Sequence, residues 1–156
     1  MKFFISHKKE DESTATRIAS ELRLLGVSFY LDIMDNSVTR NGKELTDHIR
    51  DNLNDCTDII VIMSEQTRYS QWVPFEVGMS AQLNMPTATF LQENVYLPEF
   101  LEFWPRLKYP SDIRKYVAVR RRYEIQRRSH YDSFDFASQK ETNLTAFYNA
   151  LKRELR

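Results

Sequence analysis

The chain has 156 residues, which is the size of one domain with a full hydrophobic core. Hydrophobic residues make up 42% of it and aromatic residues 13%, which excludes a disordered chain. The formal net charge is zero, but residues 106–128 carry nine lysines and arginines against two acidic residues, a local charge of +7. Such a run is more often a solvated helix face than a nucleic-acid surface, so nucleic-acid binding is not expected.

Cysteine and histidine are scarce and scattered. Cys56 has no second cysteine to pair with, and His7, His48 and His130 lack metal-ligand spacing, so the sequence predicts no structural metal and a reducing compartment. The apolar start is too short for a signal peptide, and no apolar run reaches the ~20 residues of a membrane span. We expect a soluble, cytoplasmic protein that does not enter a membrane.

The first third of the chain alternates strand and helix signals. Residues 3–6 predict a strand, and the polar residues 7–11 predict a loop after it. Ser13 and Thr14 are expected to cap a helix that stops at Gly26, because glycine permits the left-handed conformation of a helix stop.

The same alternation continues to residue 91. Residues 27–31 predict a second strand and 33–43 a long, mobile loop. A helix over 45–53 leads to the continuous apolar run 58–63, which is typical of a central parallel strand. Pro74 suits the first turn of the next helix, which begins near 71–74 and ends before Pro86 and a strand over 87–91.

This order predicts a flavodoxin-like α/β fold: an open parallel sheet of four or five strands with helices on both faces. The core spans about 2–110 of a single domain, 1–156. Residues 92–111 are expected to be irregular, followed by a basic helix with Ile113 and Tyr116, a polar linker over 129–140 and a final helix from about Leu144.

Candidate site residues follow from the sheet, because ligands bind beyond the carboxyl ends of parallel strands. The residues directly after the first three predicted strands are Ser6, His7 and Lys8; Asp32, Asp35, Arg40 and Lys43; and Ser64, Tyr69 and Ser70.

Trp72 and Glu76 are four residues apart, so on a helix they share one face. An indole beside a carboxylate suits a nucleotide: the ring stacks on a base, and the carboxylate binds ribose hydroxyls or stabilises positive charge at an anomeric carbon. The alternative is structural, with Trp72 in the core and Glu76 favoured by the helix dipole. On residue pattern alone the structural alternative is the better supported.

Other chemistries lack their usual motifs. The sequence has no dinucleotide-binding or phosphate-binding glycine loop, no serine-hydrolase elbow and no zinc-protease helix motif. Cys56 precedes a buried strand and is expected in the core rather than as a nucleophile.

Four separated segments resemble a Toll/interleukin-1 receptor (TIR) domain. They are Phe3-Phe4-Ile5-Ser6-His7-Lys8, Gly42-Lys43, Ser70-Gln71-Trp72-Val73-Pro74-Phe75-Glu76 and Phe103-Trp104-Pro105, in that order. Some TIR domains are scaffolds that signal by self-association, and others cleave the nicotinamide–ribose bond of NAD+. The W-x-x-x-E arrangement of Trp72 and Glu76 resembles the enzymes.

The resemblance implies that Glu76 is catalytic and that Trp72 stacks on the ligand, with NAD+ as substrate and no cofactor. The products would be nicotinamide and ADP-ribose or a cyclic ADP-ribose isomer. Lys8 and Lys43 would hold the diphosphate, Ser6 and His7 would line the wall, and Tyr69 would stack or hydrogen-bond. His7 stands where many members have an aromatic residue, and a purely structural role for it is equally consistent.

Stand-alone bacterial TIR proteins of this kind occur in antiphage systems such as Thoeris, where the product signals to a separate effector. The resemblance also implies self-association in which the loop at 33–43 completes a neighbouring site. Two alternatives stay open: a non-catalytic adaptor that acts through TIR–TIR contacts, and an enzyme similar to nucleoside deoxyribosyltransferases, which also use a glutamate.

Overall fold

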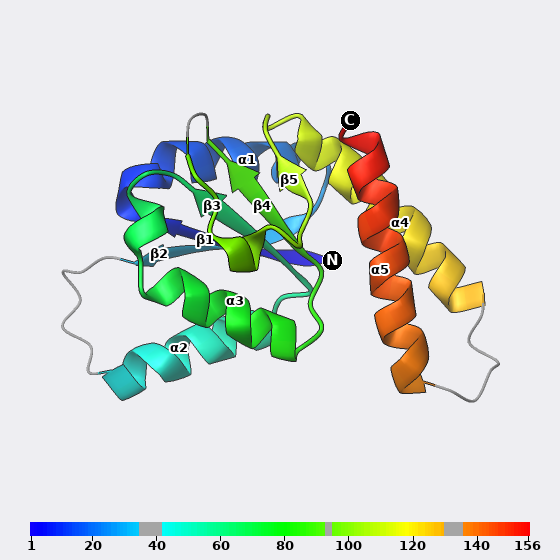
Figure 1. Ribbon diagram of the computed structural model, residues 1–156, viewed down its shortest axis with the longest axis horizontal. Helices are drawn as coiled ribbons and strands as arrows, with labels where there is room; N and C mark the ends of the chain where they lie inside the picture. Colours follow the sequence, from blue (N-terminus) through cyan, green and yellow to red (C-terminus); the bar gives the residue numbers. More distant parts are fainter. Residues whose placement is uncertain (35–41, 93–94, 130–135) are drawn as a thin grey trace.

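The computed structural model describes residues 1–34, 42–92, 95–129 and 136–156, and the side chains at 32–34, 126–129 and 136–143 lie outside that description. Within it, five parallel strands form one sheet in the order β2-β1-β3-β4-β5 (Figure 1). They are β1 (Lys2–Lys8), β2 (Ser28–Met34), β3 (Asp58–Met63), β4 (Thr87–Leu91) and β5 (Arg106–Leu107). The helices are α1 (Glu12–Leu24), α2 (Gly42–Asn54), α3 (Trp72–Gln82), α4 (Asp112–Ser129) and α5 (Phe136–Glu154). The predicted flavodoxin-like fold class is confirmed.

The strand order changes direction at β1. The chain passes from β1 outward to β2 and then returns to β3 on the other side of β1. In this order, ligands bind at the switch point, beyond the carboxyl ends of β1 and β3. Any site of this class therefore begins at residues 6–8 of β1 and at the segment that follows Met63.

Helices cover both faces of the sheet. On one face α1, α4 and α5 pack around a core that includes Phe3, Ile18, Tyr116 and Phe147. On the other face α2 and α3 pack around Phe4, Ile49 and Val77, and Figure 1 shows these two helices together below the sheet. Since side chains alternate along a strand, the odd residues of β1 face the first core and the even residues face the second.

Several predicted boundaries in the first half are wrong. Residues 7 and 8 continue β1, and 9–11 form a 3-10 helix, η1 (Lys9–Asp11), that runs directly into α1. Helix α1 therefore begins at Glu12, and Ser13 and Thr14 lie inside its first turn instead of capping it. Gly26 has φ +67°, as the predicted left-handed stop requires. Strand β2 extends to Met34.

The predicted loop over 33–43 is shorter than expected on both sides. Gly42 and Lys43 belong to the first turn of α2 rather than to a loop, because Thr46 donates its hydroxyl to the Gly42 carbonyl and Lys43 pairs with Asp47 along the helix. The rest of that loop, residues 35–41 with Asp35 and Arg40, lies outside the described residues.

The second half contains more regular structure than the sequence predicts. The segment expected to be irregular holds a 3-10 turn, η3 (Glu99–Leu101), and the short fifth strand, which pairs with Thr89 and Phe90 of β4. Helix α4 runs to Ser129 and α5 begins at Phe136, so residues 129 and 136–140 of the expected linker are helical, and residues 130–135 lie outside the description.

Candidate active site

The centre of the candidate site is a contact between β1 and α3. The hydroxyl of Ser6 donates a short hydrogen bond to Oε2 of Glu76. Both side chains are buried, with Ser6 0% and Glu76 1% exposed. Ser6 is an even residue of β1, so it points toward the α2–α3 layer, and Glu76 points back at it from the inner side of α3. A carboxylate therefore lies beside β1, at the switch point.

Trp72 begins α3, one helical turn before Glu76. Its backbone N–H and that of Val73 point at the hydroxyl of Ser70, 3.3 and 3.4 Å away, which helps to satisfy the first turn. The indole is half-buried, packs against the α2–α3 core and meets Phe75 edge to face at 5.9 Å. The structure thus leaves Trp72 half-buried at the start of α3 and buries Glu76 one turn further on.

His7 does not join this pair. As an odd residue of β1 it faces the α1 layer, on the other side of the sheet from Ser6. Nδ1 lies 3.1 Å from the Ile5 carbonyl, which only accepts hydrogen bonds, so Nδ1 carries the proton. Within the described residues, the buried Nε2 has no hydrogen-bond partner. The expectation that Ser6 and His7 line one wall is not met by this geometry.

The remaining sequence candidates lie at the periphery. Lys8 ends β1 and is half-buried. The side chain of Lys43 is 86% exposed and bonds Asp47 at 2.6 Å, and this hydrogen bond lowers the pKa of Asp47. Tyr69 is 73% exposed, with the guanidinium of Arg68 4.9 Å from its ring centre.

Asp11 is a carboxylate that the sequence analysis missed. It is 3% exposed and accepts hydrogen bonds from the hydroxyls of Ser64, at 2.7 Å, and Thr67, and from the Gln92 amide at 3.1 Å. These partners follow β3 and β4, so Asp11 ties the carboxyl ends of three strands together and fixes the segment that leads into Trp72. Its position in a polar run gave no signal, because its partners are more than fifty positions away in sequence.

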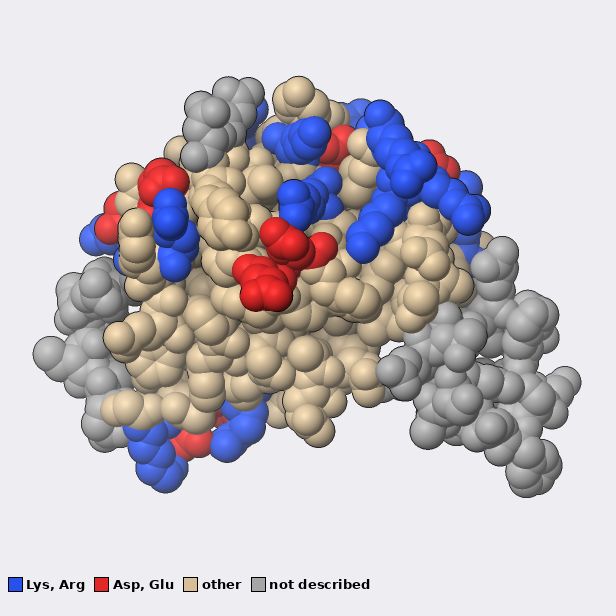
Figure 2. Space-filling view, in the orientation of Figure 1, with Lys and Arg blue, Asp and Glu red and all other residues tan. Residues whose placement is uncertain are grey.

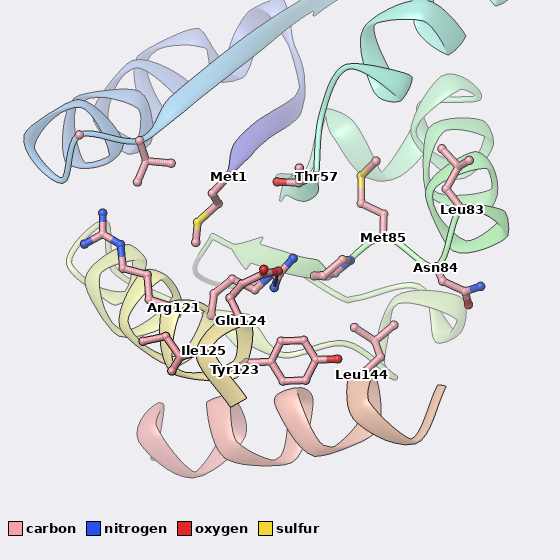
Figure 3. A pocket seen from close by; sticks show the side chains of 14 residues that line it. Met1, Thr57, Leu83, Asn84, Met85, Arg121, Tyr123, Glu124, Ile125 and Leu144 are labelled. Carbon is pink, nitrogen blue, oxygen red and sulfur yellow. Dashed lines mark hydrogen bonds and ion pairs between the residues drawn. The ribbon is translucent and has the colours of Figure 1, made fainter. Parts of the chain in front are cut away.

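Two cavities of the molecule lie away from this site. One of about 740 Å³ opens at the amino ends of the strands, where Met1, Thr57 and Met85 face Tyr123 and Glu124 of α4 across it (Figure 3). A shallower one of about 440 Å³ lies between α2 and the outer side of α3. Neither lining includes Ser6 or Glu76. We place the candidate site by the carboxylate and the strand order, because volume alone does not define chemistry.

A buried ionic network reaches the wall of the larger cavity at Arg120 and Glu124. Asp58, at the start of β3, accepts hydrogen bonds from the Tyr116 hydroxyl and from Nε of Arg120, both at 2.9 Å. Burial raises the pKa of Asp58, and Arg120 opposes that effect. Arg120 also pairs with Glu124. Arg120 thus has a structural task, and elsewhere on α4 Arg114 pairs with Glu21 and Arg122 with Glu154.

Two further findings concern only the residues that the structure describes. No three histidine, cysteine, aspartate or glutamate side chains there are grouped as metal ligands would be. No helix in the same ranges combines the length and the apolar character that crossing a membrane requires.

Comparison with known proteins agrees with the fold. The TIR domain family matches residues 3–135, most of the chain, and the chain belongs to that family. A search of curated proteins finds no match. Among solved structures, the CMP N-glycosidase BcmB of Clostridium botulinum is 16% identical, with a TM-score of 0.50 over 76% of this chain and 99% of that one. At this identity the likeness shows the shared fold.

Proposed function

We propose that this TIR domain is an enzyme that cleaves the nicotinamide–ribose bond of NAD+. The observation that supports this most is Glu76. Its carboxylate is held by Ser6 next to β1, at the carboxyl ends of the strands, where this strand order places ligands. A buried carboxylate with a hydroxyl donor is oriented before substrate arrives, and orientation of this kind contributes to catalysis of charge-forming steps.

In the proposed reaction the bond between C1′ of the ribose and the pyridinium nitrogen breaks, and its electron pair stays on nitrogen, so nicotinamide leaves neutral. The carboxylate of Glu76 binds the ribose hydroxyls and stabilises the positive charge that develops at C1′. Water then attacks C1′ and loses a proton, which gives ADP-ribose. Attack by the adenine or a ribose hydroxyl of the same molecule gives a cyclic ADP-ribose isomer instead.

Glu76 is 1% exposed, so substrate has to displace part of its cover. Trp72 is half-buried one helical turn before it and in this proposal swings to stack on the base. Lys8 and Lys43 bind the diphosphate, Tyr69 contacts the outer part of the ligand, and His7 supports the strand from the opposite face. Contacts between copies of the domain that favour this movement would increase activity, so in this proposal activity depends on assembly.

A second substrate class follows from the BcmB likeness, because that protein is described as a CMP N-glycosidase. The same carboxylate would serve any N-glycosidic bond to a base that leaves readily. NAD+ is preferred here because its pyridinium already carries positive charge and leaves without a proton. CMP is the direct comparison.

We further propose, from the family resemblance, that the product signals to a separate effector in antiphage defence and that active assemblies form by TIR–TIR contact. The competing proposal is an adaptor without catalysis. Glu76→Gln distinguishes the two, because glutamine keeps an acceptor for Ser6 but not the charge.

The experiment is incubation of the full chain at high protein concentration with NAD+ or CMP, followed by mass spectrometry of the products. We expect nicotinamide release and a loss of at least about 100-fold in Glu76→Gln. Glu65→Gln, a matched change at an exposed glutamate that pairs with Arg68, is expected to keep full turnover. Unchanged turnover in Glu76→Gln would reject the catalytic proposal, and turnover of CMP alone would reassign the substrate.

A further inference from the structure

The larger cavity lies at the opposite end of the sheet from Glu76. It measures about 740 Å³ and is bordered by α4 and by the residues directly before β1, β3 and β4, which are Met1, Thr57 and Pro86. Protein interiors are packed as densely as organic crystals, so a hollow of this size is not a packing defect. Its volume falls in the range of about 300–1,000 Å³ that is typical of sites for small molecules.

Most of the wall of this cavity is apolar or aromatic. Eight of the fourteen lining residues are of this kind, among them Val27 and Leu144. Figure 3 shows the ring of Tyr123 on one side of the cavity and the side chains of Met1 and Met85 on the other. Thioethers are flexible and polarisable and make favourable contacts with aromatic rings. The wall therefore suits a flat ring that lies between Tyr123 and the two methionines.

The ring of Tyr123 is held in place by its own contacts. Its centre lies 5.8 Å from the ring centre of Phe147 and 5.5 Å from the guanidinium carbon of Arg120. Phe147 is 1% exposed and is not part of the lining, so it supports Tyr123 from the core. Because the ring is already ordered, a ligand that stacks on it costs little side-chain entropy.

The three charged side chains of the lining already have partners among the described residues. Arg120 pairs with both Asp58 and Glu124. Arg121 donates from Nη2 to the carbonyl of Leu25, at 2.8 Å, directly after α1. An ion that entered the cavity would lose its water without meeting an unmatched charge, and this loss is unfavourable. The lining therefore favours an uncharged ligand.

The basic residues of the chain outside the cavity do not alter this preference. Figure 2 shows lysine and arginine side chains gathered on the side of the molecule formed by α4 and the end of α5. Two exposed arginines of α4 are paired there, Arg114 with Glu21 and Arg122 with Glu154, and neither lines the cavity. Their charges are balanced on the outer surface and are not directed at a ligand inside.

We propose that this cavity is a binding site for an uncharged, flat aromatic small molecule that stacks on Tyr123 and contacts Met85. Such a ligand joins α4 to the segments that precede β1, β3 and β4. It binds at the amino ends of the strands, whereas the candidate active site lies at their carboxyl ends. The inference does not depend on the proposed enzymatic activity.

The first experiment is isothermal titration calorimetry of the full chain with three probes that share one ring system. 1-Naphthalenemethanol is uncharged, 1-naphthoate is an anion and 1-naphthylmethylammonium is a cation. We expect saturable binding of the alcohol, at least about tenfold tighter than that of either ion. A smaller preference, or tighter binding of an ion, would overturn the uncharged class. An alcohol that does not bind up to its solubility limit would overturn the site.

A larger side chain in the wall tests the location. Leu144 is half-buried in the lining, and Leu144→Trp should fill part of the cavity and weaken binding of the alcohol by at least about tenfold. Leu24→Trp is the matched control, because Leu24 is 74% exposed on α1 and is not part of the lining. Its affinity for the alcohol should equal that of the wild type.

A charge in the wall tests the location with a variant that keeps the fold. Ile125 lines the cavity and is 69% exposed, so Ile125→Glu does not disturb the core. It should weaken binding of the alcohol and strengthen binding of the ammonium probe, because the new carboxylate has no cation assigned to it. Leu24→Glu should change neither affinity. Unchanged binding of the alcohol in both Leu144→Trp and Ile125→Glu would place the probe elsewhere and contradict the proposal.

Discussion

The hydroxyl of Ser6 is hydrogen-bonded to the carboxylate of Glu76, so the first strand of the sheet directly orients the side chain on which the proposed chemistry depends. Seventy positions separate the two residues in sequence. They are brought together because β1 is next to β3 and because α3, which follows β3, packs on the even side of β1.

Removal of that hydroxyl should reduce both stability and activity. In Ser6→Ala the buried carboxylate loses a donor, so we expect the free energy of unfolding to fall by about 1–3 kcal/mol and NAD+ turnover to fall with it. Urea unfolding and product assays measure the two effects. Ser20→Ala, which removes an exposed hydroxyl bonded to the Thr16 carbonyl, should change neither. Full turnover in Ser6→Ala would show that Ser6 does not position Glu76.

Replacement of His7 by phenylalanine should leave stability unchanged or increase it. The ring of His7 is 1% exposed, and its Nε2 lone pair has no partner among the described residues, which is unfavourable in an apolar layer. Phenylalanine keeps the flat ring and removes the polar atom. Thermal unfolding and NAD+ turnover of His7→Phe test this. A large loss of turnover in a stable variant would return His7 to the substrate site.

Asp11 should stabilise the segments that follow the carboxyl ends of β1, β3 and β4. Asp11→Ala removes one acceptor from each of the donors Ser64, Thr67 and Gln92, and we expect a loss of about 2–4 kcal/mol in the free energy of unfolding. Asp51→Ala on α2, where the carboxylate is 74% exposed, is the control and should cost almost nothing. Similar unfolding curves for the two variants would show that the Asp11 carboxylate does not stabilise this part of the sheet.

Asp58 should make the free energy of unfolding decrease as the pH rises. Burial raises its pKa above the ordinary 3.8, so the folded state holds the proton more tightly than the unfolded state does. Its contribution to stability is therefore fully present below pH 3.8 and is lost as pH rises through the folded pKa. The difference in unfolding free energy between wild type and Asp58→Asn, measured at several pH values, should decrease with rising pH. A difference that grows with pH would contradict this sign.

The thiol of Cys56 should react slowly with alkylating reagents. Burial raises its pKa to about 11, so almost no thiolate is present at neutral pH. Alkylation by iodoacetamide at neutral pH, followed by mass spectrometry, should be much slower in the folded chain than in urea. The stability that this thiol contributes is present below pH 9.0 and declines as pH rises through about 11. Fast alkylation of the folded protein would contradict its assignment to the core.

The alternation of strands and helices could be predicted from the sequence, because apolar residues recur with different periods in buried parallel strands and in helices. The apolar run of β3 is buried along its whole length, between β1 and β4, as expected of a central parallel strand. The predicted sheet had four or five strands, but the position of the fifth was not predicted, because it has two residues, too few for any period. The helix cap was misplaced because η1 joins α1 without a break, so Ser13 and Thr14 had no capping position to fill.

The site was only partly predictable, for a related reason. Helical spacing places Trp72 and Glu76 one turn apart, but it does not show that Glu76 turns inward to Ser6. Ser6 and His7 are neighbours in sequence, and the alternation of β1 sends them to opposite layers. The partners of Asp11 depend on which strand ends meet, and this follows from strand order, not from any local pattern.

The shortness of β5 leaves β4 close to being an outer strand. The Thr89 amide donates to the Pro105 carbonyl on that side, and two residues earlier, where β5 has not yet begun, the Thr87 amide donates to the Tyr148 hydroxyl of α5 at 3.0 Å. The last helix thereby occupies the hydrogen-bonding position of a missing strand. A chain that loses α5 would expose an open sheet edge, and its failure would take the form of aggregation between copies rather than simple unfolding.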